Sequence, residues 1–416
     1  MKRKTSKMRK TSPVFFLLFS FFLLFSNLLF VHFSSNTSHA KSFSSNISIK
    51  TPNKSSIDHV RKIAVLGKDN RISLPAKYQA LAAGIGIIGQ PGKKGWRCTA
   101  FCVAPNIIAT NAHCIVRNPT MGKRLNLAKT IFILPALTKS PLNHKYKPRI
   151  SYPEYVHQKM PGLSVYSGNY AEARHLNSQK QDWAFTKLIH SVCRGRTLDF
   201  GKEKLKQIKK AAQKNEVFMI GYHGDKDMSE RLYSNKCRIR SRNNKTFFMK
   251  KQRRQMTREA LLLPHTCDAF KGSSGSPIFL KKDNNYKVIG INLGSLKYEH
   301  FRIRRNRYTG KIISRKKLKT GKETNIAIQP KIFLEGLKRF QEETLLTNIE
   351  QFRNFQKGLK ALNFYRGKID GRFGKQTKRA IYAFEKKMKL APIGLPTKEL
   401  LDTLNIEIHK QKIFKQ

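Results

Sequence analysis

Between about residues 61 and 335, short apolar runs alternate with turn residues. The runs are short and contain many β-branched side chains, which favours strands over helices. Many short strands at this spacing are typical of an all-β barrel or sandwich. We therefore predict an all-β domain over residues 61–345. The clearest runs are Ile85–Ile88, Asn106–Thr110, Lys129–Leu134, Asp182–Phe185, Glu216–Ile220 and Lys287–Ile291.

After about residue 345 the apolar positions follow a helical period instead. This change predicts a small three-helix domain over residues 346–416. Thr397 stands before the last apolar set and is suited to cap the start of a helix. The residues expected to share a face in each helix are Phe352, Phe355, Leu359 and Leu362, then Ala380, Ile381, Phe384 and Met388, then Leu400, Leu401 and Leu404.

Two stretches within the predicted all-β domain are strongly basic. Residues 202–215 have helical character, and we expect a surface helix there. Residues 301–322 show little apolar periodicity, so two interpretations are open: a solvated loop between two strands, or an arm that binds anions. We favour the loop. The basic residues of this second stretch include Arg302, Arg304, Arg305, Arg307, Arg315, Lys316, Lys317 and Lys319.

The first 40 residues have the order of an export signal. A basic prefix precedes the apolar run Val14–Phe33, and Ser38–Ala40 offers the small residues that a signal peptidase reads. We predict cleavage after Ala40. The run is also long enough to span a bilayer, so an uncleaved anchor is the alternative. In both cases we expect residues 41–60, rich in Ser, Asn and Lys, to be a flexible linker or pro-region outside the cytoplasm.

Charge adds a further constraint. The 416-residue chain has 83 Lys and Arg against 25 Asp and Glu, a formal net charge of +58. This excess favours contact with polyanions such as nucleic acid, anionic lipid or cell-wall polymers, although AT-biased coding gives a similar composition. The chain has 6 cysteines, and an even number fits an oxidising compartment.

A glycine-rich turn around a serine is the strongest local signal for chemistry. Residues 271–279 read Lys-Gly-Ser-Ser-Gly-Ser-Pro-Ile-Phe, a tight turn that leads into an apolar strand. Such a turn can present the Ser274 hydroxyl as a nucleophile. The backbone N–H groups of Gly272 and Ser274 could stabilise an oxyanion at the same place. An ordinary Ser/Gly loop is the alternative.

A histidine stands at the end of an earlier predicted strand. Residues 110–114 read Thr-Asn-Ala-His-Cys, so His113 could be the base that takes the proton of the serine. A disulfide between Cys98 and Cys114 would fix the loop that carries the histidine. A zinc site on Cys98, Cys102, His113 and Cys114 is conceivable but poorly spaced. We predict no metal and no cofactor.

These two motifs together resemble those of the trypsin-like serine proteases, whose serine motif is Gly-Asp-Ser-Gly-Gly-Pro. The resemblance covers about residues 80–335 and implies a double-barrel β fold with the site between the barrels. It also implies an aspartate that orients the histidine, followed by an apolar strand. Asp182, at the start of Asp-Trp-Ala-Phe, fits that description, so the implied triad is His113, Asp182 and Ser274.

Departures from trypsin bear on activation and specificity. Ser273 stands where trypsin has the Asp that captures a newly cut N-terminus, so that switch is not expected. The serine motif and residues 67–71 resemble the bacterial glutamyl-endopeptidase branch. Asn292, however, replaces the His that Glu-specific members carry, which argues against Glu specificity. Asp268 lies six residues before Ser274, the spacing of the acidic residue in the trypsin specificity pocket, and suggests Lys or Arg preference. A turn aspartate is the alternative.

Four further cysteines remain after Cys98 and Cys114 are paired. Four cysteines allow three pairings. We favour Cys237 with Cys267, which ties a strand to the loop before the nucleophile, and hence Cys102 with Cys193.

The helical domain resembles the peptidoglycan-binding domain type 1 over about residues 348–404. Ile369-Asp-Gly-Arg-Phe-Gly374 is the most specific part of the resemblance. The glycines of this region permit tight turns between helices, and Asp370 can bond loop backbone. The Asp-Gly run can therefore be structural rather than a contact to ligand, although the family implies wall binding.

The sequence thus predicts an exported serine endopeptidase that is held near the cell wall, in the periplasm, envelope or extracellular space. Expected partners are a protein or peptide substrate and peptidoglycan or another anionic envelope polymer. Specific nucleic-acid binding is not expected, and membrane contact is expected only if the N-terminal segment stays uncleaved. Two alternatives remain: a catalytically silent protease fold that binds the envelope, and a hydrolase of wall peptide crosslinks.

Overall fold

The computed structural model divides the chain into two compact units, Met1–Thr51 and Pro52–Gln416. The structure describes residues 56–61, 65–89, 96–115, 130–134, 149–151, 164–168, 180–226, 228, 230–241, 261–283, 285–306, 308–320 and 323–413. The predicted export signal and its cleavage site lie outside the described residues. In the part that is described, no helix is long and apolar enough to cross a membrane.

A seven-stranded antiparallel sheet forms the first half of the all-β region. Its central strands are fully buried because nearly every side chain is apolar, as the short runs predict. The order of its strands is β7 (Arg149–Ser151), β6 (Ile131–Leu134), β3 (Ile85–Gly89), β4 (Trp96–Ala104), β5 (Ile107–Thr110), β9 (Ala184–Lys187) and β8 (Val165–Ser167).

A nine-stranded sheet forms the second half. Its main path is β12 (Leu262–His265), β16 (Thr324–Ile328), β14 (Asn285–Arg305), β13 (Pro277–Lys282), β10 (Val217–Tyr222), β11 (Arg231–Ser234) and β2 (Arg71–Ser73). The short helices around the sheets are α1 (Gln79–Ala82), α2 (Ala112–Ile115) and α4 (Leu205–Gln213). The basic stretch 202–215 thus contains the helix expected there.

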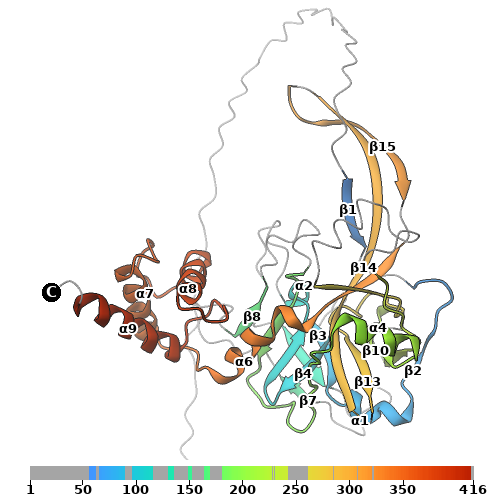
Figure 1. The fold of residues 1–416 in the computed structure, drawn as a ribbon, viewed down its shortest axis with the longest axis horizontal. Helices are drawn as coiled ribbons and strands as arrows, with labels where there is room; N and C mark the ends of the chain where they lie inside the picture. The colour runs from blue at the N-terminus through green and yellow to red at the C-terminus, as the bar shows by residue number, and fades with distance from the viewer. Residues whose placement is uncertain are drawn as a thin grey trace, which may run out of the picture. The chain divides into compact units, whose positions relative to one another are not determined.

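One expectation about an irregular segment was wrong. Most of residues 301–322 belong to a hairpin of β14 and β15 (Ile312–Thr320) instead of a loop (Figure 1). This hairpin is defined by backbone pairing between its two strands, so it needs no apolar alternation of its own. The end of the segment expected to be a linker or pro-region, residues 41–60, belongs to β1 (Ser56–Arg61), which pairs with the other edge of β14.

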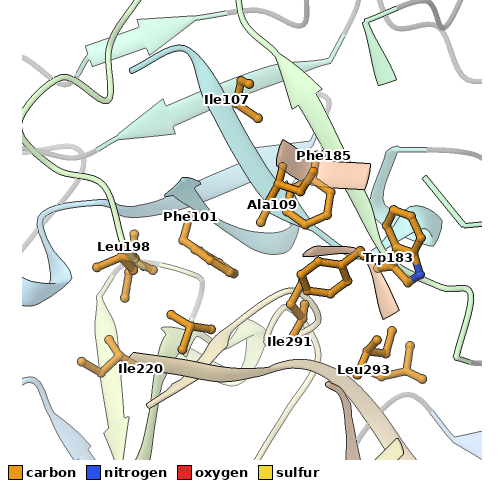
Figure 2. Packing of buried hydrophobic residues seen from close by; sticks show 14 of the residues in the cluster. Phe101, Ile107, Ala109, Trp183, Phe185, Leu198, Ile220, Ile291 and Leu293 are labelled. Carbon is orange, nitrogen blue, oxygen red and sulfur yellow. The ribbon is translucent and has the colours of Figure 1, made fainter. Parts of the chain in front are cut away.

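One hydrophobic core joins the two sheets. Phe101, Ala109 and Phe185 come from the seven-stranded sheet and pack toward Ile220 and Ile291 of the nine-stranded sheet (Figure 2). All five side chains are buried. Because the apolar side chains of both sheets pack in one core, the loops at the ends of one sheet have a fixed position relative to those of the other.

The C-terminal region is helical, so the predicted class, an all-β protease-type domain with a small C-terminal helical domain, is confirmed. The helices are α7 (Ile349–Ala361), α8 (Lys375–Lys387) and α9 (Lys398–Ile413), and α6 (Leu334–Glu342) precedes them. Thr397 caps α9 as predicted, because its Oγ1 accepts a hydrogen bond from Leu400 N–H. Gln356 Nε2 donates a hydrogen bond to Asp370 Oδ1 at 3.1 Å, so the aspartate of the Asp-Gly turn has a structural contact.

A half-buried arginine connects α6 to α8. Arg339 donates from Nη2 to Glu343 and from Nη1 to Glu385, both at 2.9 Å. The Glu385 carboxylate is fully buried and also accepts bonds from the N–H groups of Ile393 and Gly394. Burial raises the pKa of Glu385, so its charge depends on these donors.

We expect Arg339→Met to lower the free energy of unfolding by about 3 kcal/mol, because it leaves the buried Glu385 carboxylate without its cationic partner. Urea unfolding of the purified protein measures the change. Lys338→Met is the matched control, since Lys338 pairs with Glu342 at 4.0 Å on the exposed side of the same helix. Equal costs for the two variants would contradict a bridging role for Arg339.

Two buried histidines lie in the nine-stranded region. His265 ends β12 and His223 follows β10, and neither side chain is exposed. Burial lowers the pKa of His223 to about 3 and that of His265 to about 4. Both rings are therefore neutral in the folded protein at pH values where an unfolded chain already binds protons.

Stability should consequently fall as the pH drops below about 6.5, the ordinary pKa of histidine. Each buried ring contributes up to about 1.4 kcal/mol per pH unit until its own folded pKa is reached. We expect His265→Gln to reduce the slope of unfolding free energy between pH 6.5 and 5 by that amount, measured by urea unfolding. An unchanged slope would refute the assignment.

Candidate active site

His113 lies one turn beyond a buried strand. Strand β5 ends at Thr110, and the short helix α2 places His113 directly beside Cys114. Cys114 is bonded to Cys98 of β4, as expected from the spacing. The histidine is thus tied to two adjacent strands, and its side chain is 15% exposed.

Asp182 stands just before β9, which pairs with β5. The register places Ala184 opposite Thr110, so Asp182 and His113 leave the sheet at the same end. Asp182 Oδ2 lies 2.7 Å from His113 Nδ1, and Oδ1 accepts the backbone N–H of His113 at 2.8 Å. Asn111 Nδ2 donates to the Asp182 carbonyl at 2.8 Å. These contacts fix the position and orientation of the Asp182 carboxylate relative to the His113 ring.

Ser274 lies in the tight turn that leads into β13. Gly272 and Gly275 have φ values of +95° and +88°, which non-glycine residues rarely adopt. A Cβ on Gly275 would lie 2.1 Å from the backbone carbonyl oxygen of Thr99, so space as well as conformation requires glycine there. Ser274 is 6% exposed, and its Oγ donates to the carbonyl of Leu293 at 3.4 Å, a long and weak bond.

Thr99 brings the serine turn to the histidine. Its N–H donates to the Ser274 carbonyl at 2.9 Å, and its Oγ1 donates to the Gly272 carbonyl at 3.0 Å. Thr99 follows Cys98, whose disulfide reaches Cys114 beside His113. Thr99 therefore connects the serine turn to the sheet that carries His113 and Asp182. No local sequence pattern indicates this role of Thr99.

Asp268 and Asn292, the two candidates for the specificity pocket, are both buried, and at most 1% of the surface of either residue is exposed. The Asp268 oxygens accept the N–H groups of Leu66 and Asn70 at 2.8 and 3.0 Å, and burial raises the pKa of this carboxyl. Asn292 Nδ2 donates to the Ser273 carbonyl at 2.9 Å. The polar atoms of both side chains thus support the serine loop, and their effect on specificity stays a prediction.

The structure pairs all six cysteines. Besides Cys98–Cys114 it contains Cys102–Cys193 and Cys237–Cys267, the pairings favoured from the sequence. His113 and the sulfurs of Cys98 and Cys114 lie within 4.8 Å of one another. Because those sulfurs are bonded to each other, they do not offer the thiolates that a zinc site requires.

Sequence reasoning also missed a polar cluster behind the serine turn. Arg71 contacts Asp69, Asp225 and His223, and His223 in turn contacts the backbone of Phe270. The only sequence pattern that includes a residue of this cluster is the stretch 67–71, which resembles the glutamyl-endopeptidase branch. That resemblance does not indicate which residues Arg71 contacts.

A cavity of about 550 Å³ lies beside the aspartate. Gln181 and Trp183, the chain neighbours of Asp182, form part of its wall, together with Glu335 and Tyr382. The indole N–H of Trp183 is buried and has no hydrogen-bond partner among the described residues. The cavity is thus bounded by residues of the all-β domain and of helix α8.

Two family models match the chain. The model of the trypsin-like peptidase domain matches residues 98–291, and that of the putative peptidoglycan binding domain matches residues 348–404. The first match contains His113, Asp182 and Ser274, and the second contains helices α7 and α8.

Similar proteins include the carboxy-terminal processing protease CtpB of Bacillus subtilis (strain 168), 38% identical over 96 residues. That match takes in 23% of this chain and only 20% of CtpB. A Glu endopeptidase solved in complex with MPD has a TM-score of 0.40 and 16% identity, over 66% of this chain and 98% of its own. The secreted serine protease VesC from Vibrio cholerae has a TM-score of 0.44 and 11% identity, over 66% of this chain and 49% of its own.

The two family matches follow each other along the chain without overlap, and the structure forms an all-β region and a helical region over the same residues. The chain therefore carries a trypsin-like peptidase domain, followed by a putative peptidoglycan binding domain.

Proposed function

We propose that Ser274, His113 and Asp182 act as a catalytic triad that hydrolyses peptide bonds through an acyl-enzyme. The observation that carries this proposal is the two-point contact of Asp182 with the ring and the backbone of His113. The contact favours the tautomer in which Nδ1–H donates to the carboxylate. His113 Nε2 then has a lone pair with which to accept the proton of Ser274.

In the first step, Ser274 Oγ attacks the substrate carbonyl carbon while His113 Nε2 takes its proton. The N–H groups of Gly272 and Ser274 stabilise the resulting oxyanion, an interaction that contributes roughly 3 kcal/mol per donor. The C–N bond then breaks, and His113 gives the proton to the leaving amine. Water repeats the sequence on the ester, and the proton returns to Ser274. The 3.4 Å bond from Ser274 Oγ to Leu293 is weak enough to be exchanged for His113.

We also propose that the enzyme is exported and works close to the cell wall. Three disulfides support an oxidising compartment, and the order of basic, apolar and small residues before residue 41 supports export. The peptidoglycan-binding domain supports a location at the wall. Exposed cations on that domain, including Arg366, Arg372 and Lys375, complement anionic wall polymers.

Fluorophosphonate labelling and peptide cleavage test the triad. We expect Ser274→Ala to abolish labelling and to lower kcat/KM by about 10⁴-fold or more, because the nucleophile is lost. Ser276→Ala is the matched control, since Ser276 Oγ is buried without a partner among the described residues. It should label and cleave like the wild type. A wild-type protein that neither labels nor cleaves would support the catalytically silent alternative.

Retention on purified sacculi tests wall binding. We expect a triple Ala variant of Arg366, Arg372 and Lys375 to bind about fivefold more weakly, since each exposed cation contributes a few tenths of a kcal/mol. A triple Ala variant of Lys202, Lys206 and Lys210, exposed residues in or near α4, removes the same charge from the all-β domain. If both variants lose the same affinity, retention reflects net charge and not the helical domain.

A further inference from the structure

The residues just before the serine turn are bonded to the loop after β10. Phe270 N–H donates to Nδ1 of His223 at 3.1 Å, and Gly224 N–H donates to the carbonyl of Lys271. Ser273 N–H then donates back to the Phe270 carbonyl at 2.9 Å. The backbone path that reaches Gly272 and Ser274 is therefore set from residue 270 onward by the contacts of His223 and Gly224.

His223 must be neutral and must keep a lone pair on Nδ1 to accept the Phe270 N–H. Its ring is fully buried, and Nη1 of Arg71 also lies 3.0 Å from the same nitrogen. Two donors directed at Nδ1 leave the ring proton on Nε2. Burial and the nearby guanidinium lower the pKa of His223, so this tautomer persists at neutral pH. The Nε2–H group has no partner among the described residues.

Arg71 is held by two carboxylates. Its Nε and Nη2 groups donate to Asp69 at 2.9 and 2.6 Å, and its Nη1 and Nη2 groups donate to Asp225 at 3.0 and 2.5 Å. With His223 as fifth acceptor, every N–H of the guanidinium has a partner. The side chain is 3% exposed, so the arginine is a fixed part of the structure and not a mobile surface cation.

The segment that contains Arg71 is attached to the serine loop at a second point. Asp268 accepts the N–H group of Leu66, at the other end of the same short segment, and that of Asn70, next to Arg71. Residues 66–71 therefore contact the serine loop through Asp268 and through the series Arg71, His223, Phe270. Both connections end on the residues that precede Gly272.

We propose that His223 and Arg71 are positioning residues, which hold residues 270–272 so that the N–H groups of Gly272 and Ser274 face the reacting carbonyl. This inference rests on the proposed roles of Ser274 and its oxyanion site. His223 supplies the acceptor, and Arg71 fixes the ring that carries it. Loss of the acceptor disorders the oxyanion donors, whose contribution is made in the transition state, and leaves ground-state binding nearly unchanged.

Replacing His223 by Leu or by Asn separates positioning from packing. Leu is closer to His in volume but cannot accept the Phe270 N–H. Asn is smaller, but its amide oxygen can occupy the place of Nδ1 and accept the Phe270 N–H. Asn has no group in the place of Nε2–H, but that group has no hydrogen-bond partner among the described residues. We expect His223→Leu to lower kcat by about 100-fold with KM within about twofold. His223→Asn should stay within about threefold of the wild type.

The wild type and the His223→Leu and His223→Asn variants are compared as whole chains. For each protein, kcat and KM are measured on a peptide substrate, together with the rate of fluorophosphonate labelling. Hydrogen exchange is measured for the peptide that spans residues 268–276. Exchange should be faster in His223→Leu and unchanged in His223→Asn. Arg231→Leu is the control for loss of a buried polar group in the same sheet, since Arg231 donates to the Ala82 carbonyl away from the serine loop. It should keep the wild-type kcat.

A His223→Leu protein with wild-type kcat and exchange would overturn the inference. So would equal losses in the Leu and Asn variants, because packing alone would then explain them. If the wild type itself neither labels nor cleaves, the proposed function is wrong. The exchange experiment still decides in that case whether His223 orders the serine loop.

Discussion

The hydrogen bonds of Thr99 are the contacts on which the rest of the site depends. Thr99 lies in β4 of the seven-stranded sheet and is fully buried. Its N–H and Oγ1 groups bind the carbonyls of Ser274 and Gly272, and its Oγ1 accepts the N–H of Tyr222 from β10. The Thr99 carbonyl accepts Thr110 Oγ1 at 2.8 Å. One residue thus joins the serine turn, β5 and β10, which are segments from both sheets.

The local parts of the site could be predicted, because each is a short motif with its own chemistry. His113 and Ser274 both stand at the end of, or just before, an apolar strand, and the turn glycines that flank the serine are required by their backbone conformation. Asp182 was implied by the family resemblance, in which the orienting aspartate precedes an apolar strand. The predicted strands were found because their apolar runs are continuous and fully buried.

The long-range parts could not be predicted, since nothing in a local pattern specifies a partner far along the chain. Thr99 and Gly272 are separated by 173 residues, and Arg71 and Asp225 by 154. The hairpin of β14 and β15 was mistaken for a loop because backbone pairing, not apolar alternation, defines it. Asp268 illustrates the same limit: its spacing from Ser274 suggested a pocket, but its oxygens bind the backbone of residues 66 and 70.

The scarcity of acidic residues makes their placement informative. The chain has 25 Asp and Glu against 83 Lys and Arg, so the acidic residues are too few to pair one to one with the cations. Two arginines with little exposure nevertheless each hold two carboxylates: Arg71 holds Asp69 and Asp225, and Arg339 holds Glu343 and Glu385. A buried guanidinium is tolerated only when its charge and its donors are satisfied. One cluster supports the serine loop, and the other joins α6 to α8.

The second cluster constrains how the helical domain lies on the all-β domain. Arg339, the bonds between residues 344–346 and 396–399, and the burial of Ile393 and Leu395 in the main core attach the helical domain directly to the all-β domain. A flexible tether would let the site sample many orientations, whereas direct packing fixes one. If the helical domain binds a surface, as proposed above, that binding would orient Ser274, His113 and Asp182 relative to the surface as well as bring them close to it.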